Sequence, residues 1–431
     1  MPSAGGRTAS PLTRTPLPTT EQAPYADFVP PINKSRRRTA APDARTDLTR
    51  LRTALTTFFA LDGFIFAGWV VRIPAIKEQT GATAGTLGLA LLGVSAGAVI
   101  TMMLTGRLCR RYGNHRVTVV CAVLLSLSVA LPPLTHSVPA LTAVLLVFGA
   151  AYGGINVAFN SAAVDLVAAL RRPIMPSFHA AFSLGGMIGA GLGGLVAGAF
   201  SPTRHLLGLT AVGLVVTAVA GRTLLRQEPP RPPDRVVDSA GRGESRRPDR
   251  RTRGLVVVFG LIALCTAYGE GAMADWGALH LEQDLDAPPG LAAAGYACFA
   301  LAMTVGRLTG SALLERLGRT RTVVFGGATA AVGMLLGSLS PAVWAALLEF
   351  AVTGLGLANL FPIAIERAGA LAGPSGVATA STLGYGGMLL GPPAIGFMAD
   401  WLSLPTALTS VAALAAVASV IGAATRHTTT D

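Results

Sequence analysis

The sequence predicts an all-α membrane protein with twelve transmembrane helices arranged in two six-helix bundles. The chain is 51% hydrophobic and 13% charged, whereas a soluble protein carries roughly 25% charged residues. It also divides into apolar runs of about 17–25 residues, the length that crosses a bilayer as a helix. In chain order the predicted spans are 51–73, 85–105, 117–134, 140–165, 176–200, 205–225, 254–281, 290–313, 322–339, 342–366, 375–400 and 404–424.

A basic, glycine-bearing loop occurs twice, at residues 106–116 and 311–321, each time between two apolar runs. Asn156 and Asn359 also occupy matching places in spans 4 and 10, and Trp69 matches Trp276 in spans 1 and 7. Such a duplication is typical of transporters and argues against an enzyme. The residues of the two loops that we expect to take part in conformational change are Gly106, Arg110, Arg111, Gly113, Arg116, Glu315, Arg316 and Gly318.

The net charge of +12 is distributed as in a membrane protein, which disfavours binding to nucleic acid. Seventeen of the 34 Lys and Arg residues lie in segments 1–50 and 226–253, and most others lie in every second loop. Because cytoplasmic loops are enriched in Lys and Arg, both termini should be cytoplasmic in a multi-pass plasma (bacterial inner) membrane protein. The predicted domains are a disordered cytoplasmic tail (1–50), an N-terminal bundle (51–225), a cytoplasmic linker (226–253) and a C-terminal bundle (254–425).

Polar side chains inside the spans recur in every third helix. Since carboxylates and amides in hydrocarbon usually face protein or a water-filled path, spans 1, 4, 7 and 10 should surround an aqueous cavity. Spans 5 and 11 carry glycines at four-residue spacing, which predicts close helix packing. Spans 3, 6, 9 and 12 are rich in Val, Leu and Ala and should face lipid. The interior carboxylates and asparagines are Asp62, Asn156, Asn160, Asp165, Glu270, Asp275, Asn359 and Glu366.

Asp62 and Glu270 are the candidates for proton coupling. Each lies near the middle of its span, where burial favours a protonated carboxyl that can release its proton during a transport cycle. The alternative for both is a packing contact with a neighbouring helix. Arg307 in span 8 should snorkel or pair with a carboxylate of its own half.

Two further groups complete the predicted site. Amides and phenols suit a hydroxylated or polar solute, although helix-to-helix hydrogen bonding is an equal alternative for the asparagines. The candidate cavity residues are Asn156, Asn160, Asn359, Tyr152, Tyr268 and Tyr385. The candidate gate residues, with His179 expected at a shallow position, are Asp165, Arg171, Arg172, His179 and Asp275.

The repeated loop resembles the Gly-x-Leu-x-Asp-Arg-x-Gly-Arg-Lys-Arg motif of the major facilitator superfamily. Gly106, Leu108, Arg111, Gly113 and Arg116 fit this motif, whereas its acidic position is Arg110 in the first copy and Glu315 in the second. Segments 172–179, 270–276 and 383–393 resemble a fucose-permease-like bacterial branch. The resemblance implies two bundles that rock about a central cavity, and a latch in which Glu315 is the stronger partner.

These features predict a secondary transporter that moves a small organic solute by alternating access, coupled to protons. Efflux of amphipathic compounds or metabolites by antiport is the alternative to sugar-like uptake by symport, since span 5 partly matches the glycine motif of family antiporters with Ala190 in place of its proline. A non-transporting membrane sensor is a further alternative. The sequence has no phosphate-binding loop and no catalytic or metal-ligand grouping, so we expect no enzyme activity, cofactor or metal. We also expect the protein to be a monomer.

Overall fold

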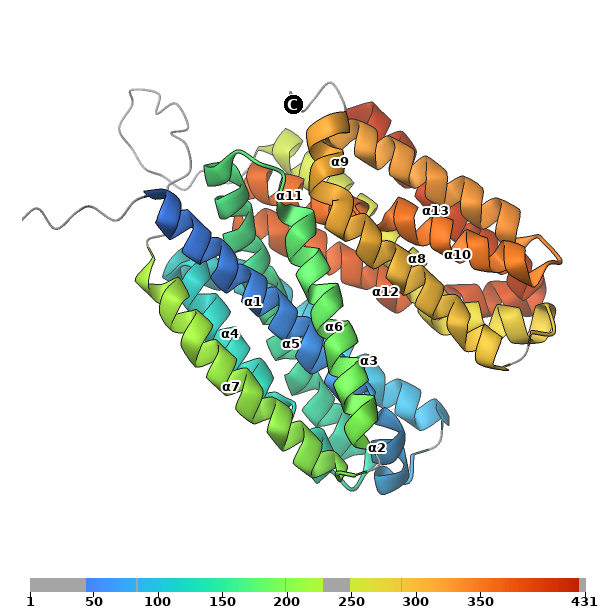
Figure 1. The fold of residues 1–431 in the computed structure, drawn as a ribbon, viewed down its shortest axis with the longest axis horizontal. Coiled ribbons are helices and arrows are strands. Elements are labelled where there is room, and N and C mark those ends of the chain that lie inside the picture. Colours follow the sequence, from blue (N-terminus) through green and yellow to red (C-terminus); the bar gives the residue numbers. More distant parts are fainter. Residues whose placement is uncertain (1–43, 83, 198, 228–248, 288, 426–431) are drawn as a thin grey trace, which may run out of the picture. The chain divides into compact units, whose positions relative to one another are not determined.

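The computed structural model describes residues 44–82, 84–197, 199–227, 249–287 and 289–425, and helices dominate the described chain (Figure 1). In chain order the α-helices are α1 (Ala44–Val70), α2 (Ile73–Thr80), α3 (Ala84–Tyr112), α4 (Asn114–Ser128), α5 (Val138–Leu170), α6 (Met175–Ala197), α7 (Pro202–Arg226), α8 (Arg250–Leu279), α9 (Pro289–Ser338), α10 (Val343–Leu357), α11 (Leu360–Ala372), α12 (Pro374–Trp401) and α13 (Leu404–Ala424). Two short turns of other helix types, η1 (Pro132–Leu134) and η2 (His280–Asp284), follow α4 and α8.

The predicted tail at 1–50 and linker at 226–253 lie largely outside the described residues. At their edges the helices extend further than the sequence predicts, because α1 begins at Ala44 and α8 begins at Arg250. Asp249 caps α8, since its carboxylate accepts a hydrogen bond of 2.8 Å from the backbone N–H of Thr252. A hydrogen bond from the Thr252 side chain, together with this backbone bond, holds the pKa of Asp249 below its ordinary value.

Twelve helical segments of the described chain can be assigned as membrane spans. Ten stretches are long and apolar enough to cross a bilayer, and one of them is the 44-residue stretch Gly295–Ser338. That stretch is two spans, because Gly318 has a non-helical φ of 78° and ψ of 166° and divides α9 into two legs. The 28-residue α12 is the remaining span. The predicted number of twelve is therefore confirmed, with α10 and α11 forming one broken span over Val343–Ala372.

Large apolar side chains cover the outside of the helices. Leu195, Ile100 and Leu336 are 82%, 68% and 70% exposed, and many other Leu, Val and Phe side chains are similarly uncovered. A soluble monomer rarely exposes apolar patches of such extent. The uncovered side chains are therefore suited to the hydrocarbon of a bilayer.

The two halves repeat the same helix pairings. In the first half α1 packs on α6, α3 on α5, and α4 on α7. In the second half α8 packs on α12, the first leg of α9 and α10 lie together, and α9 also packs on α13. In the first half these pairs join spans 1 and 5, 2 and 4, and 3 and 6. In the second half they join the corresponding spans 7 and 11, 8 and 10, and 9 and 12. This repetition confirms the two six-helix bundles that the duplicated sequence predicts (Figure 1).

Glycine lets two of these pairs approach at backbone distance. A Cβ at Gly185 of α6 would overlap the backbone of Ala60 in α1, and a Cβ at Gly387 of α12 would overlap the backbone of Leu264 in α8. The sequence prediction that the glycines of spans 5 and 11 serve packing agrees with these contacts.

One end of the helices carries most of the described arginines, and we call it the basic face. It is formed by the beginnings of α1 and α8, the turns at Gly113 and Gly318, and the ends of α5, α7, α11 and α13. Gly113 and Gly318 both have positive φ, 87° and 78°. Glycine adopts this conformation readily, so each copy of the repeated loop joins two helices through a single residue.

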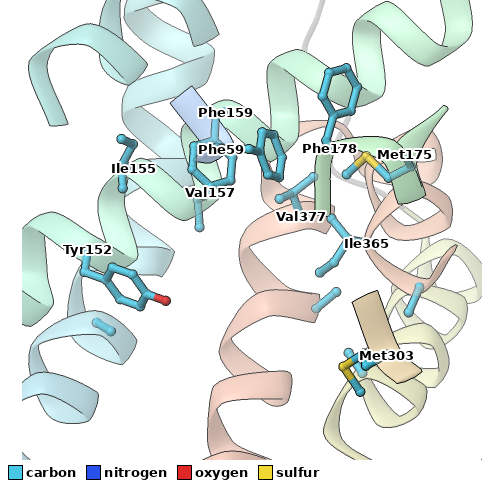
Figure 2. Packing of buried hydrophobic residues seen from close by; sticks show 14 of the residues in the cluster. Phe59, Tyr152, Ile155, Val157, Phe159, Met175, Phe178, Met303, Ile365 and Val377 are labelled. Atoms are coloured by element: carbon cyan, nitrogen blue, oxygen red, sulfur yellow. The ribbon is translucent and has the colours of Figure 1, made fainter. Parts of the chain in front are cut away.

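The bundles meet through helices of both halves. The main pairs are α3 with α12 and α6 with α9, and α5 and α11 also touch the opposite bundle. Within the first bundle, Phe59 packs against Phe159 and Phe178, with ring centroids 3.9 and 5.3 Å away (Figure 2). This buried aromatic core fixes α1, α5 and α6 close to the junction, where polar side chains also gather.

Candidate functional site

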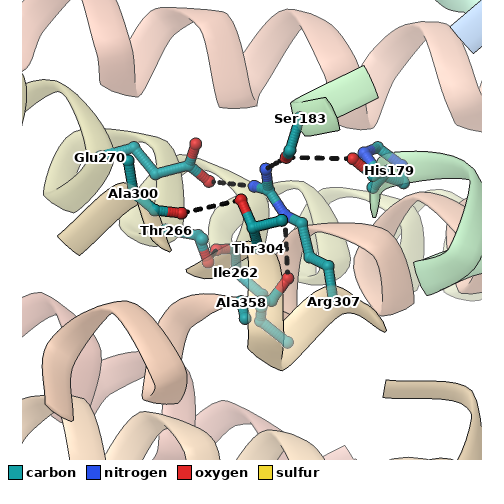
Figure 3. Close-up of polar contacts among 9 residues, drawn as sticks. All are labelled: His179, Ser183, Ile262, Thr266, Glu270, Ala300, Thr304, Arg307 and Ala358. Atoms are coloured by element: carbon teal, nitrogen blue, oxygen red, sulfur yellow. Dashed lines mark hydrogen bonds and ion pairs between the residues drawn. The ribbon is translucent and has the colours of Figure 1, made fainter. Parts of the chain in front are cut away.

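Arg307 is the centre of a polar network at the junction of the bundles (Figure 3). Its Nη2 donates to Glu270 Oε1 of α8 at 3.0 Å, and its Nη1 donates to Ser183 Oγ of α6 at 2.9 Å. The Arg307 side chain is 8% exposed and that of Glu270 is 29% exposed. The network therefore contains a largely buried ion pair of the second bundle and a hydrogen bond that reaches the first bundle.

A break in the tenth span supplies the third partner of Arg307. Pro362 lacks an N–H, so it cannot donate to the carbonyl of Ala358 four residues earlier, and the helix is interrupted between α10 and α11. The Nε of Arg307 donates to this Ala358 carbonyl over 3.4 Å. Beside the break, Asn359 Nδ2 donates to the Gly306 carbonyl of α9 at 3.0 Å.

The neighbouring hydroxyls are occupied within their own helices. Thr266 and Thr304 each donate to the carbonyl four residues earlier, at 2.9 and 2.8 Å (Figure 3). They lie one turn from Glu270 and Arg307 respectively. The polar groups directed from these two helices toward the junction are therefore the carboxylate and the guanidinium.

Asp62 of α1 is fully buried, and neither carboxylate oxygen has a hydrogen-bond partner among the described residues. An ionised carboxylate in such surroundings is costly unless it is paired. Asp62 and Glu270 both lie in the neighbourhood of the Tyr152 and Tyr385 hydroxyls.

Tyr152 of α5 and Tyr385 of α12 meet across the junction. Their rings are 6.1 Å apart in an edge-to-face arrangement. Phe66 of α1 stacks on Tyr152 at 4.9 Å. These rings pack α1, α5 and α12 against one another at the junction.

His179 is the fifth residue of α6 and is buried between the two bundles. It is 7% exposed, its ring contacts Phe59 of α1 and Phe361 of α11, and its Nε2 has no described partner. Its backbone carbonyl accepts from Ser183 Oγ at 3.2 Å, which connects it to the Arg307 network. Its part in a gate stays a prediction.

Two of the other predicted cavity residues are directed into their own bundles. The hydroxyl of Tyr268 is hydrogen-bonded to Ser410 Oγ of α13 at 2.8 Å, so it points away from the junction and its prediction as a cavity residue is corrected. Asn160 is fully buried and its Nδ2 donates to the Asn156 carbonyl at 2.8 Å and to Asn156 Oδ1 at 3.4 Å. Asn160 thus ties one turn of α5 to the next.

The predicted gate residues do not form one cluster. Asp165 accepts a 2.6 Å bond from Asn114 of its own bundle, and Asp275 is an exposed residue of α8. Arg171 is exposed and has a left-handed φ of 51°. Arg172 forms an ion pair with the other bundle, where its Nη2 donates to Glu315 Oε1 at 2.8 Å.

The two loop copies differ in their ion pairs. In the second half, Arg319 donates twice to Glu366 Oε1, at 2.8 and 2.6 Å. At the corresponding place in the first half, the uncharged amide of Asn114 donates to the carboxylate of Asp165. Among the loop residues predicted to take part in conformational change, the exposed ones are Arg110, Arg111, Arg116, Glu315 and Arg316.

Gly106 has a different place in this arrangement. A Cβ at Gly106 of α3 would lie 2.9 Å from the Ala378 Cβ and 3.0 Å from the Pro374 carbonyl oxygen of α12. The first loop therefore begins at a close contact between the bundles, near the basic face.

Sequence reasoning missed two polar residues and one contact. Ser183 was not distinguished because a serine in an apolar run usually bonds its own helix. The carboxylate of Glu349 in span 10 was overlooked, although a charged residue in an apolar run is itself a signal. Arg307 pairs with a carboxylate of its own half, Glu270, as the sequence predicts. Its additional link to Ser183 was missed, because that link depends on the packing of α6 against α9.

Twelve membrane-crossing helices in two matching bundles, with buried polar groups where the bundles meet, define a multi-pass membrane protein of the transporter class. A model of the Major Facilitator Superfamily matches residues 53–273 and 259–430. The chain therefore belongs to the major facilitator superfamily.

Related proteins agree with this assignment. An uncharacterised transporter of this superfamily from Yersinia pestis is 34% identical over 371 residues, covering 85% of this chain and 92% of the relative. An uncharacterised transporter from Sinorhizobium fredii is 33% identical over 372 residues, covering 84% and 95%. Among solved structures, the transporter FucP in its outward conformation superposes with a TM-score of 0.71 and 15% identity, covering 88% of this chain and 98% of FucP. This last similarity shows the shared fold.

Proposed function

We propose that this protein is a proton-coupled secondary transporter that moves a small organic solute by alternating access between its two bundles. The observation that carries the proposal is Asp62, a fully buried carboxylate without a described partner beside the junction. A proton is the smallest ligand that removes the cost of its charge. Positive-rich loops further support a cytoplasmic location for the basic face and for both termini.

The roles of the other residues follow from their contacts. Glu270 is paired with Arg307, and its proposed part in the transport cycle is the opening of that pair. Arg307 also holds Ser183 of the first bundle, and opening the pair would therefore loosen the contact between the bundles. Tyr152 and Tyr385 are the proposed solute contacts, because they meet at the junction from opposite bundles.

The related proteins support transport and leave the solute open. FucP is described as a fucose:proton symporter of E. coli, and a proton:xylose symporter, XylE, shares the fold with a TM-score of 0.68 and 11% identity. Proton-coupled uptake of a hydroxylated solute is the first form of our proposal. Efflux by proton antiport is the second form, supported by the apolar and aromatic walls of the junction.

The proposal is tested with Asp62→Asn in proteoliposomes. A thermal-shift screen of the purified wild type against sugars, metabolites and drugs supplies the solute, and its flux is then measured with proton gradients of either direction. The sign of the driving gradient separates symport from antiport. We expect Asp62→Asn to abolish proton-driven accumulation while solute exchange without a gradient remains.

Glu282→Gln is the matched control, because Glu282 is an exposed acid beyond the end of α8 and removing its charge should leave coupling unchanged. Undiminished proton-driven accumulation by Asp62→Asn would remove Asp62 from the coupling role. A wild type without saturable flux of any solute in the screen would instead favour a sensor that has kept the transporter fold.

A further inference from the structure

Glu349 of α10 is a second buried carboxylate without a partner. It is 2% exposed, and both of its carboxylate oxygens are buried without a hydrogen-bond partner among the described residues. The hydroxyl of Thr353, one turn further along α10, is also buried without a hydrogen-bond partner among the described residues. This polar pair lies outside the network of Arg307 and Asp62.

The Glu349 side chain faces the second leg of α9. A Cβ at Gly337 would overlap the Cβ of Glu349 and lie 2.6 Å from its Oε2, and a Cβ at Gly333 would lie 3.5 Å from the Thr353 hydroxyl. Further along, Gly356 of α10 approaches the backbone of α9. The carboxylate is thus held in the seam between the ninth and tenth spans, on the contact surface of two helices of one bundle.

The charge environment of this seam disfavours an anion. Gly337 is the penultimate residue of α9, and the carbonyl end of a helix carries partial negative charge. The titratable groups of the helices packed on α10 are committed or distant. Arg307 is paired with Glu270 in the junction and Arg319 with Glu366 at the basic face. His280, beyond α8, is bonded through Nδ1 to Asp284, and its buried Nε2 has no hydrogen-bond partner among the described residues, so it makes no bond to Glu349.

The other charged groups of those helices lie elsewhere. Asp275 of α8 and Tyr296 of α9 are exposed residues, and the Tyr268 hydroxyl of α8 is bonded to Ser410. The groups toward the basic face, at the beginning of α8, at the Gly318 turn of α9 and in α11, are Arg250, Arg251, Arg253, Glu315, Arg316, Arg321 and Arg367. Among the described residues, no ion pair or hydrogen bond compensates a charge on Glu349. The seam therefore requires a cation at this carboxyl group or a neutral carboxylic acid.

We propose that Glu349 is a proton-binding site of the C-terminal bundle, separate from the junction, and that its proton stabilises the seam between α9 and α10. The close contact with Gly337 leaves no room for the several oxygen ligands that a metal cation requires. Ionisation at high pH places an unpaired charge in the seam and loosens the bundle. This inference does not depend on proton coupling at Asp62.

The test compares the wild type with Glu349→Gln, whose amide has the shape of the neutral acid. Thermal unfolding of both purified proteins is measured between pH 5 and 8. A carboxyl that is protonated when folded and ionised when unfolded releases one proton on unfolding, which raises the unfolding equilibrium constant about tenfold per pH unit. We expect the melting temperature of Glu349→Gln to exceed that of the wild type by a margin that grows with pH.

Glu366→Gln is the control, because Glu366 is paired with Arg319 and its loss should lower stability instead. The infrared difference between wild type and Glu349→Gln should also contain the C=O stretch of a protonated carboxylic acid. A margin that is constant across the pH series, or no such band, would overturn the proposal. Failure of Glu349→Gln to fold would overturn it too, since the isosteric amide should replace a neutral acid.

Discussion

Arg307 is the residue whose contacts involve the most helices at the junction, and its pair with Glu270 is largely buried. Removing one partner of a buried pair leaves the other charge uncompensated and costs about 3–5 kcal/mol. Because Glu270 is 29% exposed, we expect the lower part of that range for Glu270→Leu and for Arg307→Met. The double variant should lose clearly less than the sum of the two.

Thermal unfolding of the four proteins in detergent measures this coupling as a double-mutant cycle. Arg222→Met is a suitable control, since Arg222 is an exposed residue of α7. Strict additivity of the two single losses would show that the pair contributes no interaction energy in the folded protein.

The candidate residues illustrate what sequence can and cannot predict at this scale. The depth of Asp62 and Glu270 follows from their places in the apolar runs, and both are located at or beside the junction. The direction of a side chain around its helix does not follow from hydropathy alone. For this reason Tyr268, which bonds Ser410, was assigned to the cavity.

At the scale of single helices, the glycines of α6 separate into two kinds. Gly185 lies against the backbone of Ala60, whereas Gly191 has open space around its Cα. We expect Gly185→Ala to destabilise the protein by about 1–3 kcal/mol, because the added methyl forces α1 and α6 apart. Gly191→Ala should be neutral or stabilising by up to about 1 kcal/mol, since alanine is the better helix former.

Melting temperatures of the two variants, measured side by side, test this contrast. Equal destabilisation by both substitutions would indicate that glycine acts in α6 through backbone flexibility and not through close packing.

The helices themselves were largely predictable, because hydropathy and length determine which segments cross the bilayer. Irregular features were not. At the break between α10 and α11, Arg307 of α9 donates to the Ala358 carbonyl and Asn359 donates to the Gly306 carbonyl of α9, so both contacts depend on a neighbouring helix. The single-residue turns at Gly113 and Gly318 were marked by the loop motif, but their shared positive φ is visible only in the structure.

At the scale of the whole molecule, the duplicated sequence implies two equivalent bundles, and the observed helix pairings repeat accordingly. The contacts between the bundles are less symmetric. Arg172 reaches Glu315, while the corresponding acidic position of the first loop is the exposed Arg110. The predicted latch thus corresponds to the ion pair of Glu315, in the second loop copy, with Arg172. Its role in transport stays a prediction.

The pair of Arg172 and Glu315 is the site at which alternating access can be tested directly. Both side chains are exposed, 63% and 43%, and such pairs contribute at most about 1 kcal/mol. Arg172→Ala should therefore change the balance of the two transport states by no more than about fivefold. A covalent link at the same place should act far more strongly, because the bundles must separate at the basic face for the transporter to open there.

Cysteines at positions 172 and 315 are introduced into a protein whose native Cys109, Cys121, Cys265 and Cys298 have been replaced. Joining them with a short bis-maleimide should abolish solute flux in proteoliposomes. The two single-cysteine variants, treated with the same reagent, lose the same ion pair but cannot be joined, so they should retain flux. Full flux in the joined protein, with the link verified by mass spectrometry, would show that transport proceeds without separation of the bundles at this contact.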